Sequence, residues 1–220
     1  MIATQMTLAE LAVKRPAASR VFHRHGLDFC CHGNRALEEA CAERGLLSSS
    51  LLEEIANEER ICGELPVWET RPLPQIISHV VGHYHTRLRE ELPLLIRMAE
   101  RVEKVHSGKA SCPRGLADHL HSMHTAVLEH LAKEELILFP MITAGRGTRA
   151  SIPIHMMEVE HEDHGESLKK TRELTRDLAI PPEACATWSA LYMRLEEFEA
   201  ELMEHIHLEN NVLFRRALCE

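Results

Sequence analysis

Apolar residues recur three and four positions apart through most of the chain beyond residue 73. On an α-helix, which turns ~100° per residue, this spacing places them on one face. It predicts four long helices, over about residues 74–106, 114–143, 151–178 and 183–217. Short connections that contain glycine or proline separate them, so consecutive helices are expected to be antiparallel. The pattern therefore predicts an up-and-down four-helix bundle.

A proline-rich stretch separates this bundle from the residues before it. Three prolines fall between Glu64 and Pro74, where a helix cannot continue unbroken. Helix formers dominate on both sides, and alternating strand patterns are scarce. We therefore predict an all-α protein, with a small N-terminal helical module over residues 1–66 and the bundle over residues 67–220.

Local signals in the N-terminal module predict where its short helices begin. Thr7 and Glu10 match a capping box, and Pro16 is suited to the start of a second helix. The serines at 48–50 are suited to cap a further helix that runs to about Cys62.

Two similar segments of the bundle carry a histidine and a glutamate four residues apart. They are His130 with Glu134 and His205 with Glu209, and each pair lies one turn apart on a helix face. Both pairs fall within the apolar stripe of their helix. A buried His/Glu pair is costly unless something compensates it. Two such pairs in one bundle predict a metal site, and favour one with two metals.

The apolar stripes also decide which other histidines face inward. In the third helix both His161 and His164 face inward, and the pattern does not choose between them. The stripe of the first helix has His85 at its edge and consists of Ile77, Val81, Tyr84, Leu88, Leu92 and Leu95. The stripe of the second helix consists of Leu116, Leu120, Met123, Val127, Leu131, Leu138 and Met141. At least one inward histidine per helix and two inward glutamates match a pair of metals bridged by carboxylates.

The ligand types restrict the identity of the metal to a few candidates but do not select one. Imidazole with carboxylate suits iron, manganese or zinc, and glutamates that bridge inside a bundle favour two irons or two manganese ions. Seven other histidines are expected on the surface, at residues 79, 83, 106, 119, 121, 155 and 207.

Composition limits the partners and the compartment. The formal charge is −9 and no basic stripe is present, which argues against a nucleic-acid partner. No apolar run approaches membrane-spanning length, and the first residues lack the features of a signal peptide. A cytoplasmic location is expected, in which most of the 7 cysteines are free thiols.

The adjacent pair Cys30 and Cys31 is the other segment that suggests chemistry. Adjacent cysteines form a disulfide only with strain, so both are expected to be reduced. Three histidines lie nearby in the sequence, at 23, 25 and 32, and an imidazolium lowers a thiol pKa. The pair is equally consistent with a metal or redox site and with two partly buried structural thiols.

Several long segments, in order along nearly the whole chain, together resemble one known family. They are Asp28-Phe-Cys-Cys-His-Gly-Asn34, Tyr84-His85, the run from His130 to Met141, Glu160-His161, the run from Pro181 to Trp188, and the run from His205 to Phe214. With them the chain resembles the di-iron iron–sulfur-cluster repair proteins, a bacterial group related to hemerythrin and induced by nitric oxide and oxidative stress.

This resemblance implies a hemerythrin-like bundle with two oxo- and carboxylate-bridged iron ions. It implies the ligands His85, His130, His161 and His205, with Glu134 and Glu209 as bridges, and so selects His161 over His164. A histidine at position 164 is not expected in this family. We expect it to act as a hydrogen-bond donor to a ligand rather than as a further ligand.

The function implied by the resemblance is the repair of iron–sulfur clusters, by iron donation, by removal of nitric oxide, or by both. The partners are then damaged iron–sulfur proteins, with nitric oxide or O2 as small ligands, and Cys30 and Cys31 assist electron or metal transfer. Two alternatives stay open: an enzyme, a di-iron nitric oxide reductase, and a hemerythrin-like sensor that binds O2 or nitric oxide. A homodimer that uses the N-terminal module is also left open.

Overall fold

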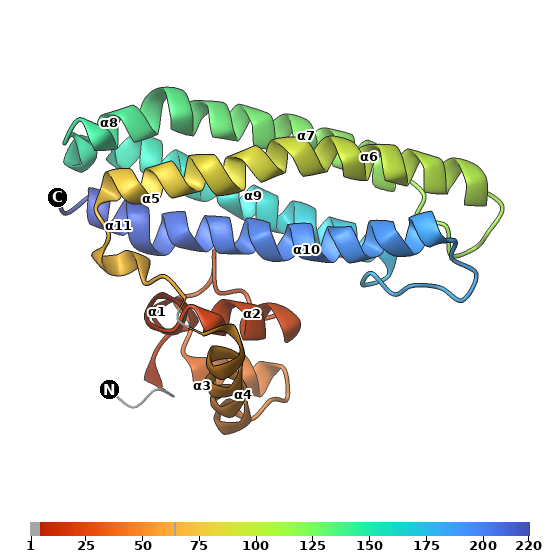
Figure 1. Cartoon of the computed structure of the whole chain (residues 1–220), viewed down its shortest axis with the longest axis horizontal. Helices are drawn as coiled ribbons and strands as arrows, with labels where there is room; N and C mark the ends of the chain where they lie inside the picture. Colours follow the sequence, from red (N-terminus) through yellow and green to blue (C-terminus); the bar gives the residue numbers. More distant parts are fainter. Residues whose placement is uncertain (1–4, 64) are drawn as a thin grey trace.

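The computed structural model describes residues 5–63 and 65–220, and their regular structure is helical. The predicted all-α fold, a helical module followed by a helical bundle, is confirmed (Figure 1). The first four residues of the chain and Glu64, with which the predicted linker begins, lie outside the described residues.

The N-terminal module packs short helices around a small core of its own. Thr7 closes the predicted capping box, because its hydroxyl accepts from the Glu10 amide at 3.2 Å and its own amide donates to Glu10 at 3.0 Å. The last helix of the module begins at Ser48 as predicted, but Leu47 is its N-cap and the serines form its first turn. The helices are α1 (Leu8–Lys14), α2 (Ala17–Arg24), α3 (Leu37–Glu43) and α4 (Ser48–Cys62).

Four long helical rods run side by side in the bundle (Figure 1). The first consists of α5 (Leu73–His79), η3 (Val80–His85) and α6 (Thr86–His106); the second of α7 (Leu116–Lys133), η4 (Glu134–Leu138) and α8 (Phe139–Thr143); the third of α9 (Ser151–Thr175); and the fourth of α10 (Ala186–Leu208), η6 (Glu209–Leu213) and α11 (Phe214–Ala217). The short 3₁₀ turns η2 (Trp68–Thr70) and η5 (Gly147–Arg149) precede α5 and α9. Within the described part of the chain, no helix combines the length and apolar character needed to cross a membrane.

Three of the four rods contain a π-helical turn, namely η3, η4 and η6. On a regular α-helix, residues five apart point ~140° away from each other. Across each π turn, however, both residues of such a pair are buried. The pairs are Val80 with His85, Glu134 with Phe139, and Glu209 with Phe214. The π turns therefore allow the polar ligand candidates and the neighbouring apolar residues to face the same interior.

These turns correct the predicted stripes at two places. In the first rod the buried residues are Ile76 and Val80, whereas the predicted Ile77 and Val81 are only partly buried. In the second rod Ile142 is buried in place of the predicted Met141. Each error is one residue: Ile77 and Val81 lie before and within η3, and Met141 lies after η4. An i→i+5 turn accommodates an extra residue that a strict 100° repeat ignores.

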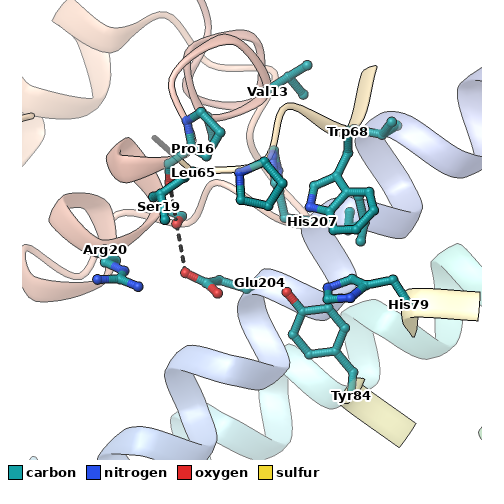
Figure 2. A pocket seen from close by; sticks show the side chains of 14 residues that line it. Val13, Pro16, Ser19, Arg20, Leu65, Trp68, His79, Tyr84, Glu204 and His207 are labelled. Carbon is teal, nitrogen blue, oxygen red and sulfur yellow. Dashed lines mark hydrogen bonds between the residues drawn. The ribbon is translucent and has the colours of Figure 1, made fainter. Parts of the chain in front are cut away.

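The module lies against the fourth rod, where α2 contacts α10 and α1 contacts η6 (Figure 1). A cavity of about 140 Å³ remains at this junction. Figure 2 shows that Trp68, His79 and Tyr84 line one side of it, and that Ser19 donates to Glu204 over 2.9 Å on the other side. The Tyr84 ring stacks on His205 with ring centroids 5.3 Å apart, so this junction adjoins the interior of the bundle.

Candidate metal centre

Six ionisable side chains from all four rods meet in the middle of the bundle. They are at most 2% exposed, and they are His85, His130, Glu134, His161, His205 and Glu209. Three of the six lie at the π turns: His85 ends η3, Glu134 begins η4, and Glu209 begins η6. All six predicted metal ligands are thus brought together, whereas Cys30 and Cys31 lie outside this cluster.

The six residues form two groups that share the same two carboxylates. His85 and His205 form one group with Glu134 and Glu209, and His130 and His161 form the other group with the same glutamates. Oε2 of Glu134 lies 3.3 Å from Nε2 of His85 and 3.5 Å from Nε2 of His130. Each group has the donor atoms for one cation, and the shared glutamates link the two positions.

The two oxygens of Glu209 point to different groups. Oε1 lies 3.1 Å from Nε2 of His205, and Oε2 lies 3.2 Å from Nε2 of His161. A carboxylate in this orientation offers one oxygen to each of two neighbouring cations.

Hydrogen bonds at Nδ1 fix three of the imidazoles. His85 pairs with Glu135 at 2.7 Å, His130 with Glu160 at 2.9 Å, and His161 with Oδ1 of Asn210 at 2.7 Å. Because carboxylate and amide oxygens only accept, Nδ1 of each of these imidazoles carries the hydrogen. The neutral ring then presents the lone pair of Nε2 to the centre, which is the orientation a metal ligand requires.

The atoms that could bind a metal face one another at the centre, and most of them have no hydrogen-bond partner. Nε2 of His130 lies 3.0 Å from Nε2 of His161, so two lone pairs point at each other. Both oxygens of Glu134 and both oxygens of Glu209 are buried and unpaired among the described residues, and so is Nε2 of His85. Buried polar atoms are normally paired, and buried charge is normally compensated. Cations between these atoms remove both costs, so the residues present fit a metal centre.

The protonation of these groups follows from their burial. Burial lowers the pKa of His85 to about 4 and that of His130 to about 2, so both imidazoles are neutral near pH 7. Burial and the neighbouring Glu209 raise the pKa of Glu134 well above its usual range. Burial acts in the same direction on Glu209, but His205 and His161 hold its pKa well below the usual range. A bound cation would stabilise the ionised forms of these two buried carboxylates.

His164 lies beside the centre without joining either group. It is buried, and its ring stands edge-on to His130 with centroids 5.0 Å apart. Its Nε2 has no hydrogen-bond partner among the described residues. The expected hydrogen bond from His164 to a ligand is therefore not formed through Nε2.

Two histidines predicted to lie on the surface are buried. His106 packs against Trp188 with ring centroids 4.9 Å apart, and His207 packs edge-on to Phe29 at 5.4 Å. The prediction was wrong for His106 because the stripe of the first rod was followed only to Leu95, whereas its buried face continues through Ala99 and Val102 to His106. It was wrong for His207 because it considered only one face of the fourth rod. The opposite face of the fourth rod is covered by the N-terminal module.

The residues that hold the imidazoles in place were missed by the sequence reading. They are Glu135, Glu160 and Asn210. Two of them directly follow the glutamates of the HxxxE pairs, and each accepts from a histidine of another rod. The similarity between the two HxxxE segments therefore extends to the residue after each glutamate. This similarity is the sequence signal that could have identified Glu135 and Asn210.

The cysteine pair lies at the junction of the module with the bundle. Its two Sγ atoms are 3.7 Å apart, and both cysteines are free thiols. The hydrogen bond with Cys31, together with burial, raises the pKa of the Cys30 thiol well above its usual range. The nearby histidines do not activate Cys30: His32 pairs with Asp28 and His25 pairs with Glu54, each at 2.7 Å.

Comparisons with known proteins agree with this arrangement. Residues 76–217 match the model of the hemerythrin HHE cation binding domain, and residues 4–59 match a domain of unknown function, DUF542. The chain is 46% identical over 215 residues to a protein of Citrobacter koseri named iron-sulfur cluster repair protein YtfE, with 96% of each chain covered. Proteins of the same name from Dickeya chrysanthemi and Yersinia pseudotuberculosis are 46% and 44% identical over 212 residues, again with 96% of each chain covered.

Proposed function

The chain belongs to the hemerythrin HHE cation-binding domain family, and on that basis we propose that it binds two iron ions and repairs damaged iron–sulfur clusters. The damage in question is that caused by nitric oxide or oxidation. The observation that carries the di-iron part is the pair of overlapping His/Glu groups, because both groups use the same two glutamates.

In this proposal each iron would be held by two imidazoles and by the two shared carboxylates. His85 and His205 would hold one iron, His130 and His161 would hold the other, and Glu134 and Glu209 would be shared between them. The iron pair, when bound, supplies redox chemistry and a store of exchangeable iron. A small ligand such as nitric oxide or O2 would bind the irons at positions that these six side chains do not occupy.

The chain itself sets the conditions at the centre. The His85 and His130 imidazoles are neutral near pH 7. Glu135 and Glu160 hold these two rings in the orientation that presents Nε2. Buried apolar side chains beside the ligands, such as Leu88, Val127 and Leu202, exclude water. Electrostatic interactions are stronger in such a dry environment, which favours retention of the cations.

Repair of a cluster requires that iron or nitric oxide passes between the buried centre and another protein. The names of the relatives refer to cluster repair, and the chain matches them over nearly their whole length. The part of the surface next to the centre carries Cys31, whose Sγ lies 3.5 Å from the backbone oxygen of His161. The clients in this proposal are proteins with damaged iron–sulfur clusters.

The first test measures metal content and the optical spectrum of protein from iron-replete cells. Glu134→Ala and Glu209→Ala are compared with Glu129→Ala, a change at an exposed glutamate of the rod that carries Glu134. We expect about two irons per chain and near-ultraviolet oxo-bridge bands, lost in the first two variants and retained in the third. Zinc, or no metal, would contradict the di-iron centre.

The second test measures repair. A [4Fe–4S] protein damaged by nitric oxide is incubated with the loaded protein, and the recovery of its cluster absorbance is followed. We expect recovery with the wild type and Glu129→Ala but not with Glu134→Ala. Steady formation of nitrous oxide over many turnovers without recovery would indicate a reductase, and reversible binding alone would indicate a sensor.

A further inference from the structure

A second set of metal-binding side chains lies apart from the bundle centre. Ligand atoms of Asp28, Cys30 and Cys31 all lie within 4.8 Å of one another. They line a groove of about 700 Å³ between the module and the rods α9 and α10. Cys30 is buried and Cys31 is partly exposed, so the set is reached from the groove on one side.

The spacing of these atoms matches that of ligands around a tetrahedral cation. Zinc bound by thiolate at ~2.3 Å and by carboxylate at ~2.1 Å implies about 3.8 Å between two sulfurs and about 3.6 Å between sulfur and oxygen. The observed distances are 3.7 Å between the two Sγ atoms and 3.4 Å between Sγ of Cys30 and Oδ1 of Asp28. The three side chains thus need little movement to bind one cation.

The surrounding loop holds these ligands in position. Oδ1 of Asp28 accepts from the backbone amides of Cys30 at 3.2 Å and Cys31 at 3.0 Å, and Oδ2 pairs with Nδ1 of His32 at 2.7 Å. Gly33 closes the loop so tightly that a Cβ there would lie 2.3 Å from the Phe29 carbonyl oxygen. Ligands that are fixed before binding cost less to order on binding.

We propose that Asp28, Cys30 and Cys31 form a cation site for a borderline divalent metal, and that ferrous iron passes through it between the buried centre and a client in the groove. The transit role rests on the proposed function, whereas the site itself does not. Soft thiolates with one carboxylate suit such a cation. Binding replaces two thiol protons, which pass to solvent, and leaves a fourth position open towards the groove.

The position of the site fits this role. Sγ of Cys31 lies 3.5 Å from the backbone oxygen of His161, and Nδ2 of Asn210 donates to the backbone oxygen of Cys30 over 3.3 Å. Asn210 also accepts from His161, so one amide side chain contacts both the cysteine loop and a ligand of the centre. A cation bound at the cysteines would therefore be separated from His161 of the bundle by a single intervening residue, Asn210. On its other side this cation would face the groove.

The test is a titration of the reduced, iron-loaded full-length chain with Co²⁺, read by the near-ultraviolet thiolate-to-cobalt charge-transfer band. This band reports sulfur ligands only, so cobalt at the His/Glu centre does not produce it. We expect one equivalent to bind in the wild type, loss of the band in Cys31→Ser, and at least ~10-fold weaker binding in Asp28→Asn. Asp28→Asn keeps an oxygen that accepts from the loop amides, so the loop is expected to stay folded.

The matched control is Cys62→Ser. Cys62 is another partly buried thiol of the module beside a carboxylate, 3.2 Å from Glu58, and its loss is expected to leave the band unchanged. No band in the wild type, or a band that survives Cys31→Ser, overturns the site. Full cluster repair by Cys31→Ser, in which the band is lost, overturns the transit role and leaves the proposed function standing. The band together with normal iron content but no cluster repair by the wild type overturns the proposed function and leaves the site standing.

Discussion

Nδ1 of His161 donates to Oδ1 of Asn210 over 2.7 Å, and Asn210 directly follows Glu209 in the chain. The same relationship occurs in the other half of the centre, where Glu135 follows Glu134 and accepts from His85. Each of the two shared glutamates is thus followed by a residue that fixes an imidazole of a different rod. The start of the π turn therefore places one glutamate of the centre, and the next residue orients one of its histidines.

Loss of the acceptor at Asn210 is expected to weaken iron binding. Asn210→Leu leaves Nδ1 of His161 without a partner, and the loss of such an outer hydrogen bond typically reduces metal affinity 10–100-fold. Asn210→Asp retains an acceptor and is expected to stay near the wild type. The measurement is iron retention against a competing chelator.

Asn211→Leu is the control for this prediction. Asn211 also donates to the backbone oxygen of Cys30, at 3.2 Å, but has no contact with His161 among its hydrogen bonds. Iron retention should therefore be close to that of the wild type. Equal losses in Asn210→Leu and Asn211→Leu would mean that the cysteine loop, and not the orientation of His161, controls iron affinity.

The register across the π turn at Glu134–Leu138 is expected to be essential for the centre. Insertion of one alanine after Leu136, which is 78% exposed, places Glu134 and Phe139 six positions apart, and such residues point ~120° away from each other on a regular α-helix. We expect unchanged far-ultraviolet circular dichroism and loss of most of the bound iron in this variant. Deletion of Leu136 places the same two residues four positions apart on one helix face, so it is expected to retain the iron, as is Leu136→Ala. Full iron content after the insertion would show that the register across the turn has no part in the site.

The same turns mark the limit of what the sequence revealed. The inward placement of Glu134 and Glu209 followed from a 100° repeat because each lies one regular turn after its histidine. Across the π turns that repeat loses its phase, so Ile77 was assigned to the core in place of Ile76. His207 was misassigned for a different reason, because burial by another module leaves no periodic signal in its own helix. Local spacing therefore predicted the two His/Glu pairs, the family resemblance supplied the choice of His161 over His164, and tertiary contacts decided the rest.

His164 is expected to be dispensable for iron and unfavourable for stability. It is buried beside His130 and its Nε2 is unpaired, which costs ~1–3 kcal/mol relative to a paired or apolar group. His164→Leu is therefore expected to keep two irons and to raise the free energy of unfolding by about 1 kcal/mol or more. The readouts are iron content and urea denaturation. Loss of one iron in this variant would instead identify His164 as a ligand.

His207 is expected to make the protein less stable as the pH falls. Burial lowers its pKa to about 4, below the value of about 6.5 expected in the unfolded chain. Its Nδ1 accepts from Asn211 at 3.1 Å, which requires the neutral ring. Above pH 6.5 neither state binds the proton, so the stabilisation is complete. Between pH 6.5 and 4 the unfolded state binds it first, and stability declines by up to about 3 kcal/mol.

The measurement that isolates this contribution is the change in unfolding free energy between pH 7 and pH 5, at equal metal loading. Titration of His207 accounts for about 2 kcal/mol of that change, so His207→Gln should show a correspondingly smaller dependence on pH. His155→Gln, at an exposed position, should behave like the wild type because that ring is not buried. All three proteins carry the same residues at the metal centre. Any release of metal at acid pH therefore contributes equally to each protein and cancels in the comparison. An unchanged pH dependence in His207→Gln would mean that the junction between module and bundle already opens at pH 7, where the ring would titrate as it does in water.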